Sequence, residues 1–317
     1  MAWIRRVVFF GTPEFAVPTL EALVAAGRPP ALVVSQPDRP AGRGQRLASP
    51  PVATRARALA LPVAQVERVR EPGFLAELVA LAPDLAIVVA FGQVFPPALL
   101  SLPAQGCINL HASLLPRWRG AAPIQAAIAA GDVETGVTTM RMEAGLDSGP
   151  ILLQQPTAIG ERETAGELAV RLAVLGAKLV LATVAALERD EIAPRPQDPA
   201  LVTVAPKAPK GRPRVDWSEP ATAIDRHLRA ASPIPGLGFA LDEEEIRLLA
   251  GRPLGAQAST DGAAPGTVLG LLGPHLAVAA GQRSVFGIEC AQRPGRRPVA
   301  ARDLANGLHL EPGARLE

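Results

Sequence analysis

Short apolar runs alternate with helix-spaced apolar segments through the first half of the chain. A run of four to seven apolar residues that ends at a turn is typical of a strand buried on both faces. Such runs predict strands at Val7–Phe10, Ala31–Val34, Pro62–Val66, Leu85–Phe91 and Cys107–His111. Helix-spaced segments lie between them, at residues 14–26, 52–60 and 74–81. This alternation predicts an α/β fold with a Rossmann-like, mostly parallel sheet and helices on both faces.

The pattern continues to a long amphipathic segment at Thr164–Glu188, which is predicted to be a helix. Thr164 and Glu167 are spaced as a capping box at its start. Before it come a predicted helix and two predicted strands, at residues 121–130, 136–142 and 151–155. We therefore expect one α/β domain over residues 1–190.

The ends of the predicted strands indicate where a ligand binds. Ligands of open α/β sheets lie beyond the carboxyl ends of the strands, and Gly11, Ser35, Gly92 and His111 lie at or just after such ends. The first turn does not read G-x-G-x-x-G, the pattern that cradles a dinucleotide phosphate. We therefore expect no nicotinamide or flavin cofactor.

Candidate chemistry lies at the end of the strand Cys107–His111. Asn109 and His111 are two residues apart, so their side chains share a face. An amide beside an imidazole can hold an oxyanion and move a proton; the alternative is a strand that merely ends in polar residues. Asp147, in the glycine-containing turn of residues 143–150, either caps that turn or presents a carboxylate to the same cleft.

An arginine-rich segment, Gln36–Ser49, is predicted to be a loop at the rim of this cleft and contains Arg39, Arg43 and Arg46. Guanidinium groups on a mobile arm are suited to nucleic-acid phosphates. The alternative is a solvated insertion, because only three of the 32 basic residues of the chain are lysines and arginine is therefore common throughout.

Residues 191–213 are expected to form an extended linker. Six prolines between residues 193 and 213 oppose both helix interiors and central strands. The end of the linker is basic, and Lys207 there is a candidate contact for RNA phosphates; a merely solvated linker is the alternative.

Residues 214–317 contain a helix-like segment, Ala221–Ala231, and then short strand-like runs separated by Gly and Pro. The runs lie at residues 246–250, 266–272, 276–280 and 285–290. Many short strands in about 100 residues are typical of a small barrel, so an OB-like β-barrel domain is expected. The acidic run Asp242–Glu245 is expected to be a hairpin turn that points away from RNA.

Composition narrows the class of protein further. A length of 317 residues with 48% hydrophobic residues suits two domains, and the net charge of +2 gives no global field for nucleic acid. No uninterrupted apolar run approaches the roughly 20 residues of a membrane span, so no membrane partner is expected. Cys107 and Cys290 form no C-x-x-C pair, which favours reduced thiols in the cytoplasm. The four histidines lack ligand spacing, so no metal site is expected.

Four segments carry a resemblance to a known family: Gly11–Ala16, Gln36–Gly44, Asn109–Ile124 and Gly145–Gly149. Together they resemble the methionyl-tRNA formyltransferases, over nearly the whole chain. The Asn-x-His and Ser-Leu-Leu-Pro parts alone are shared by all formyltransferases and hydrolases that depend on 10-formyltetrahydrofolate. The arginine-rich segment together with the second domain narrows the resemblance to the tRNA enzymes.

The resemblance implies transfer of the formyl group of 10-formyltetrahydrofolate to the α-amine of methionine on initiator tRNA, in support of translation initiation. It implies the catalytic set Asn109, His111 and Asp147. It also implies a folate-binding segment made of Ser113, Leu114, Leu115 and Pro116, and an arm in which Arg43 meets the tRNA acceptor end. We expect a cytoplasmic monomer.

These residue types suit a direct acyl transfer. Attack of the amine on the formyl carbon creates a tetrahedral oxyanion, to which the Asn109 amide and a protonated His111 can donate hydrogen bonds. A carboxylate at Asp147 would favour the charged imidazolium by charge pairing. No Ser or Cys nucleophile is required.

Two other functions fit parts of the sequence. A formyltransferase that uses the same donor on a small amine would need neither the arginine-rich segment nor the second domain. A non-catalytic RNA-binding module with a vestigial cleft would not need Asn109, His111 and Asp147 together.

Overall fold

The computed structural model describes residues 4–41, 44–207, 211–242, 244–255 and 258–317. The chain forms two compact units that do not follow a single cut in the sequence. The first unit takes the chain up to Pro123 together with Glu134–Ala158 and Ala169–Pro206. The second takes Ile124–Val133, Ile159–Leu168 and the chain from Lys207 onward.

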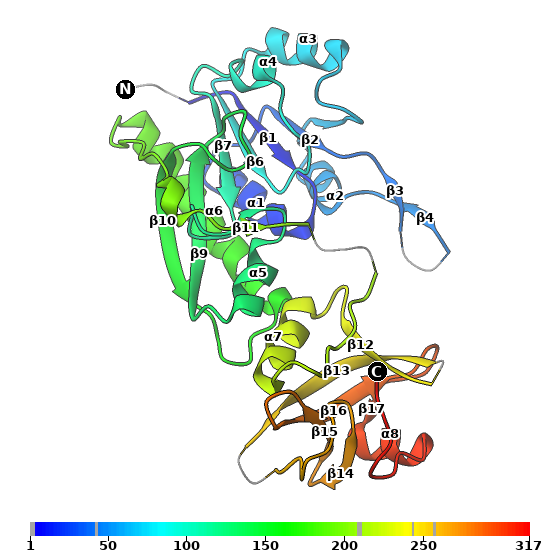
Figure 1. The fold of residues 1–317 in the computed structure, drawn as a ribbon. Helices are drawn as coiled ribbons and strands as arrows, with labels where there is room; N and C mark the ends of the chain where they lie inside the picture. Colours follow the sequence, from blue (N-terminus) through cyan, green and yellow to red (C-terminus); the bar gives the residue numbers. More distant parts are fainter. Residues whose placement is uncertain (1–3, 42–43, 208–210, 243, 256–257) are drawn as a thin grey trace. The chain divides into compact units, whose positions relative to one another are not determined.

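The first unit contains a seven-stranded sheet with the strand order β10-β9-β7-β6-β1-β2-β5 (Figure 1). The five strands from β7 to β5 are parallel, whereas β9 is antiparallel to both of its neighbours. The strands are β1 (Val7–Gly11), β2 (Leu32–Ser35), β5 (Val63–Gln65), β6 (Leu85–Val89), β7 (Cys107–His111), β9 (Glu134–Arg141) and β10 (Ile151–Ala158). The predicted mostly parallel sheet is confirmed.

Helices cover both faces of this sheet. On one face, Val8, Phe10 and Val88 pack in a core cluster with Phe74 of α3 and Leu99 of α4. The other face packs against the long helix α6. The approach is close, because a Cβ added at Gly176 of α6 would lie 2.5 Å from the side chain of Leu110 in β7. The helices of this half of the chain are α1 (Val17–Ala25), α2 (Pro51–Ala58), α3 (Pro72–Leu81), α4 (Pro97–Leu100), α5 (Pro123–Ala130) and α6 (Ala165–Glu188).

Helix α6 begins with the predicted capping box. The Thr164 N–H donates to Glu167 Oε2 at 2.9 Å, and the Glu167 N–H donates to Thr164 Oγ1 at 3.3 Å, so two otherwise unpaired donors of the first turn are satisfied. Among the described residues, this 24-residue helix alone is long and apolar enough to cross a membrane, and half of its most apolar stretch is buried in the protein. A buried helix in the core of a protein meets the same two criteria, so its length and composition are not evidence that it crosses a membrane.

The arginine-rich segment is not the featureless loop expected from the sequence. Two short strands, β3 (Arg39–Ala41) and β4 (Arg46–Ala48), pair antiparallel to form a ribbon (Figure 1). Asp38 and Ser49 close the base of this ribbon through a 2.8 Å hydrogen bond. Strands this short and exposed carry no apolar alternation, which is why the sequence pattern did not reveal them. Arg43 lies outside the described residues.

The second unit contains a separate antiparallel sheet with the order β12-β13-β16-β15-β14, and β17 pairs with β16. Its strands are β12 (Leu237–Leu241), β13 (Glu244–Leu254), β14 (Val268–Leu272), β15 (His275–Ala280), β16 (Ser284–Gln292) and β17 (Val299–Ala300). Helices α7 (Ala221–Ala231) and α8 (Ala301–Gly307) pack on its core. The acidic run lies at the β12–β13 hairpin, as predicted. The strands described form one path from β12 to β14, and no further pair in the described chain closes it into a barrel.

Residues 159–168 are fixed to the second unit by a buried carboxylate. Asp225 of α7 accepts a hydrogen bond from Arg229 Nε at 2.8 Å and pairs with Arg162 Nη1 at 3.3 Å. Arg162 also donates to the carbonyl of Gly251 in β13. The sequence pattern alone places these residues before α6 in the first domain, because it cannot report contacts between segments more than 60 residues apart.

Candidate functional site

The imidazole of His111, at the end of β7, is nearly enclosed and contacts a different group at each nitrogen. Nε2 lies 2.8 Å from the carbonyl oxygen of Trp118. Because a carbonyl oxygen only accepts hydrogen bonds, Nε2 must carry a hydrogen. Nδ1 lies 3.7 Å from Oδ2 of Asp147. Nδ1 is therefore the nitrogen left to gain or lose a proton.

The carboxylate of Asp147 points at His111 rather than at the backbone of its own turn. Its Oδ2 accepts a 2.8 Å hydrogen bond from the N–H of Gly120, which comes from a separate segment. The side chains of His111 and Asp147 are only 7% and 14% exposed, so little water screens their interaction. The structure thus brings together two of the three predicted catalytic residues, and of the two roles considered for Asp147 it shows the carboxylate directed at the imidazole.

Asn109 lies two residues before His111 on β7 and is partly exposed. Leu110 between them packs against α6, so strand alternation directs Asn109 and His111 to the opposite side. Within the described part of the chain, the amide of Asn109 makes no hydrogen bond. A partly exposed amide that is free to donate can bind an oxyanion.

The segment Ser113–Pro116 is held by the hairpin of β9 and β10. Thr138 Oγ1 donates to the carbonyl of Ser113 and accepts from the N–H of Leu115, at 2.7 and 3.1 Å. Gln154 Nε2 donates to the carbonyl of Leu115 at 2.9 Å. Ser113 and Leu115 are buried, whereas Leu114 and Pro116 keep exposed surface. In this predicted folate-binding segment, Leu114 and Pro116 are therefore the residues that keep solvent-exposed surface.

The segment after Pro116 supplies backbone groups to both His111 and Asp147. Trp118 gives the carbonyl and Gly120 the N–H described above. Strand β8 (Arg119–Gly120) pairs in parallel with β11 (Val204–Ala205). Gly120 has a φ of +119°, and a Cβ there would lie 2.4 Å from the carbonyl oxygen of Ala205. Only glycine allows this approach.

Gln197 is a residue of this site that the sequence did not reveal. Its Nε2 donates to the carbonyls of Asp147 and Gly149, at 2.8 and 2.7 Å, and its Oε1 accepts from Arg119 Nε at 2.9 Å. It lies in the proline-rich stretch that was interpreted as a linker. No periodicity or motif marks an isolated amide whose partners lie 48 to 78 residues away in the sequence, so no sequence signal was available.

The carboxyl ends of β1, β2 and β6 meet beside the site, as the sheet pattern predicted. Thr12 Oγ1 and Gln36 Nε2 both donate to the carbonyl of Phe91, at 3.2 and 2.8 Å. This shared carbonyl ties the first turn and the base of the arginine-rich segment to the end of β6.

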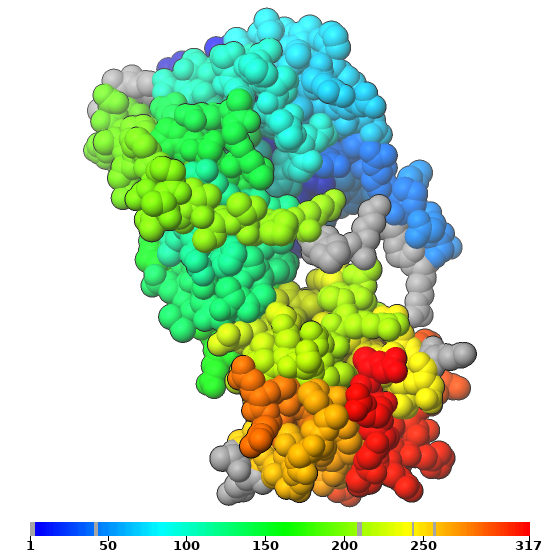
Figure 2. All heavy atoms as spheres, in the orientation of Figure 1, coloured from blue at the N-terminus to red at the C-terminus, as the bar shows by residue number. Residues whose placement is uncertain are grey.

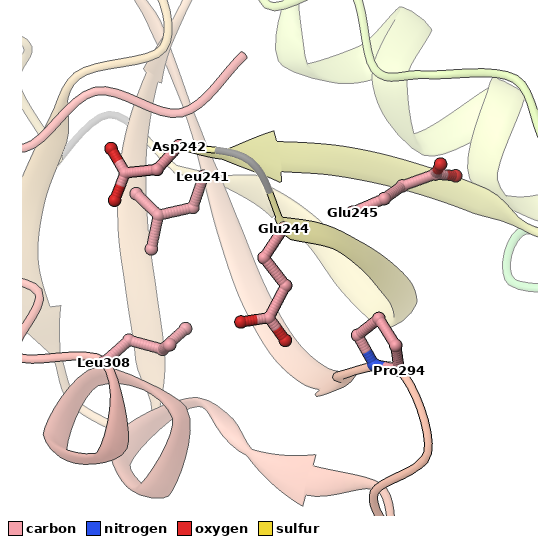
Figure 3. Close-up of a pocket in the computed structure, with 6 residues that line it drawn as sticks. All are labelled: Leu241, Asp242, Glu244, Glu245, Pro294 and Leu308. Carbon is pink, nitrogen blue, oxygen red and sulfur yellow. The ribbon is translucent and has the colours of Figure 1, made fainter.

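The two remaining predicted residues are the candidate tRNA contacts Arg43, which is outside the described residues, and Lys207. Lys207 is exposed and belongs to the second unit. A hollow in that unit is lined by residues of the β12–β13 hairpin and two loops: Leu241, Asp242, Glu244, Glu245, Pro294 and Leu308 (Figure 3). Its Glu244 is paired with Arg293 at 2.7 Å, and hydrogen bonding to Arg293 lowers the pKa of Glu244.

No group of three His, Cys, Asp or Glu side chains in the described ranges is arranged to hold a metal.

Comparison with known proteins places this geometry in a family. Residues 5–184 match the family described as Formyl transferase, and residues 208–309 match Formyl transferase, C-terminal domain. Methionyl-tRNA formyltransferase of Roseobacter denitrificans is 47% identical over 308 residues, which is 97% of each chain. The chain belongs to the methionyl-tRNA formyltransferase family. The enzyme of the same name from Stutzerimonas stutzeri is also 47% identical, over 95% of this chain and 94% of its own.

Solved structures of lower identity share the formyltransferase fold. WlaRD, a sugar 3N-formyl transferase crystallised with dTDP and 5-N-formyl-THF, is 13% identical with a TM-score of 0.65, over 93% of this chain and 100% of its own. HypX from Aquifex aeolicus, in complex with tetrahydrofolic acid, is 17% identical with a TM-score of 0.59 and covers 95% of this chain. The chain spans 46% of HypX, so this likeness concerns the fold alone. The resemblance of the motifs to the methionyl-tRNA formyltransferases is confirmed by the family comparison.

Proposed function

We propose that this chain transfers the formyl group of 10-formyltetrahydrofolate to the α-amine of methionyl initiator tRNA, as a monomer in the cytoplasm. Family membership over nearly the whole length supports the reaction. The observation that carries the site assignment is the convergence of His111 and Asp147, from separate segments, at the carboxyl end of β7 beside the free amide of Asn109.

The catalytic roles follow from which atoms are already engaged. The Nε2 hydrogen of His111 is held by the carbonyl of Trp118, so the second donor to a tetrahedral oxyanion would be Nδ1–H, on the side of the ring next to Asp147. Asn109 supplies the other donor. Removal of one such donor typically costs about 2.7–4 kcal/mol of barrier. An α-amine has a reference pKa of about 7.7–8.0, so part of the nucleophile is neutral at pH 7.

The formyl donor would be held by the segment Ser113–Pro116. Its buried backbone is fixed by Thr138 and Gln154, which leaves Leu114 and Pro116 as an apolar edge suited to the flat pterin ring. The rigid hydrogen bonding of this segment would orient such a ring without rearrangement.

We further propose that the tRNA contacts include Arg43 and Lys207. The catalytic domain would span residues 1–190, the basic linker 191–213 and the tRNA-binding domain 214–317. The antiparallel sheet of the second unit would then act as an OB-like barrel, a fold that commonly binds oligonucleotides. The ribbon of β3 and β4 would carry Arg43 to the acceptor end.

One assay tests these assignments together. The purified protein is given 10-formyltetrahydrofolate with methionyl initiator tRNA, uncharged tRNA, or small amines such as an amino sugar nucleotide, and formyl transfer is followed. Transfer only to methionyl-tRNA is expected. Transfer to a small amine alone, or no transfer with any acceptor, would overturn the proposal.

The arm is tested with the Arg43→Ala variant, with Arg5→Ala, an exposed arginine of the first unit, as its control. A higher KM for methionyl-tRNA with an unchanged KM for the folate is expected for Arg43→Ala alone. Unchanged kcat and unchanged KM for methionyl-tRNA would reject the proposed role of Arg43.

A further inference from the structure

A segment beyond α6 is fastened to the first unit beside the catalytic residues. We call residues 195–205 the strap; it lies on the surface of the first unit, yellow-green in Figure 2. At its start, Arg195 exchanges two backbone hydrogen bonds with Ile151 of β10, at 2.8 and 2.9 Å. At its end, β11 pairs with β8. The strap is therefore bound at both ends rather than being a free connection.

The end of the strap holds the backbone that contacts His111 and Asp147. Thr203 Oγ1 accepts from the N–H of Trp118 at 2.8 Å, and the carbonyl of Thr203 accepts from Arg119 at 2.9 Å. The carbonyl of Ala205 accepts from Ala121 at 3.0 Å. These bonds surround the Trp118 carbonyl and the Gly120 N–H, so the strap fixes the two backbone groups that orient the imidazole and the carboxylate.

The middle of the strap holds the turn that carries Asp147. The first half of this turn, residues 143–146, is exposed, and Leu146 is 68% exposed. Asp147 and Ser148 are partly buried and Gly149 is buried. Asp147 itself has a φ of +48°, a conformation that is unfavourable for a non-glycine residue. Gln197 donates to the carbonyls on both sides of Ser148, and Arg119 holds Gln197 in place. One amide thus ties the turn to the segment that contains Gly120.

We propose that Gln197 is a positioning residue for catalysis, which sets the distance between the Asp147 carboxylate and His111 through the backbone of the 147–149 turn. This inference rests on the proposed formyl transfer. Gln197 touches neither reacting atom; it acts through Asp147. A displacement of about 1 Å at a catalytic group can cost about 10²-fold in rate, so loss of this amide is expected to lower kcat while substrate binding is retained.

Two variants separate the roles of the amide. Gln197→Ala removes the hydrogen bonds to Asp147, Gly149 and Arg119, together with the weaker one from Nε2 to Met140 Sδ at 3.9 Å. Gln197→Glu keeps the volume and the acceptor for Arg119 but replaces the donor with an oxygen that faces the carbonyls of Asp147 and Gly149. Both variants are expected to have a kcat about 10- to 100-fold below that of the wild type, with each KM within twofold of the wild-type value. The kcat of Gln197→Glu is expected to be no higher than that of Gln197→Ala.

The matched control is Gln155→Ala. Gln155 is an exposed glutamine of β10 in the same unit. Among the described residues, its amide donates only to the carbonyl of the next residue, Pro156. Unchanged kinetics are expected for this control. Wild-type-like kcat in both Gln197 variants would overturn the proposal, and so would a loss confined to KM.

A double variant tests whether Gln197 acts through Asp147. If it does, adding Gln197→Ala to Asp147→Asn lowers kcat no further than Asp147→Asn alone, because coupled residues are non-additive. Independent multiplication of the two losses would show that Gln197 acts elsewhere and would overturn the proposal.

A measurement without substrate separates this inference from the proposed function. Amide hydrogen exchange across residues 143–150 is expected to be faster in Gln197→Glu than in the wild type or in Gln155→Ala, with an unchanged thermal midpoint. Equal exchange would overturn the positioning role even if the wild-type protein formylated a different acceptor. Failure of the wild type to formylate methionyl-tRNA would instead count against the proposed function alone.

Discussion

The carbonyl oxygen of Trp118 lies 2.8 Å from Nε2 of His111 and so determines which ring nitrogen is left to react. With a hydrogen held on Nε2, the free nitrogen is Nδ1, which faces Asp147. The backbone of a segment seven residues downstream thus selects the tautomer of the neutral imidazole. The ring nitrogen that the Trp118 carbonyl does not engage therefore lies on the side of the carboxylate.

Replacement of His111 by alanine is expected to reduce single-turnover formyl transfer by about 10²- to 10⁴-fold, the usual contribution of a positioned acid or base. The control is His309→Ala, since His309 is exposed and lies in the second unit. The rate is measured with methionyl-tRNA and 10-formyltetrahydrofolate. A His111→Ala variant that stays folded and transfers within threefold of wild type would remove the imidazole from the mechanism.

Replacement of Asn109 by alanine is expected to lower kcat by about 10²- to 10³-fold, because an oxyanion donor is lost. Its thermal midpoint should stay unchanged, since the amide makes no hydrogen bond within the described residues. Asn306→Ala, an exposed amide of α8, serves as the control. Thermal unfolding and kcat are measured on the same samples, and a large fall in midpoint with normal kcat would point to a structural role instead.

Glu188 at the end of α6 is expected to make stability depend on pH. Hydrogen bonds from Arg28 lower the pKa of this carboxyl below its ordinary 4.5, aided by the N–H of Ile4 and by the Arg28 charge and opposed by burial. A lowered folded-state pKa adds stability above the unfolded value, and that stability is lost as pH falls through the folded value. Glu188→Gln should therefore cost about 1.5–3 kcal/mol at pH 7, and the difference should shrink below pH 4.5.

Denaturant unfolding at pH 7 and at successively lower pH values measures this effect. The control is Glu191→Gln, because Glu191 pairs with Arg189 on the surface with both side chains about half exposed; such pairs contribute about 0–1 kcal/mol. A gap between wild type and Glu188→Gln that stays constant down to pH 3 would contradict the assignment.

Cys107 at the start of β7 is expected to resist alkylation in the native protein. Burial raises its pKa to about 12, so almost no thiolate is present at pH 8. Burial also raises the pKa of Cys290, but that thiol is only partly buried and should react first. Peptide mapping after iodoacetamide treatment of native and unfolded protein measures both, and native labelling of Cys107 at the rate of Cys290 would contradict the prediction.

The central sheet could be predicted from sequence because its strands are buried on both faces. Runs such as Val7–Phe10 and Leu85–Phe91 contain apolar residues almost without interruption, and they coincide with β1 and β6. The ribbon of β3 and β4 and the pairing of β8 with β11 were not predicted, because strands of two or three residues are too short to show a periodicity. Backbone pairing rather than side-chain burial defines them.

In the site, too, the features set by neighbouring residues could be predicted, whereas contacts between distant segments could not. The two-residue spacing of Asn109 and His111 placed them on one face, and Asp147 was recognised with its two possible roles. Gln197 could not be found, because its importance lies only in which carbonyls it reaches. The enclosure of Ser113 was also invisible, since a Ser-Leu-Leu-Pro motif does not reveal which of its side chains face inward.

The strap also determines where this chain should be truncated if the first unit is to be studied alone. The first family match ends at residue 184, which suggests a cut soon after α6 to isolate the catalytic half. Such a fragment would lack Gln197, Thr203 and Ala205. The N–H groups of Trp118, Arg119 and Ala121 would then lose the acceptors that Thr203 and Ala205 provide. A fragment that ends after Pro206 keeps them. Inactivity of the shorter piece would then report the loss of these contacts around His111 and Asp147 and not a need for residues 208–309, which match the C-terminal domain of the family.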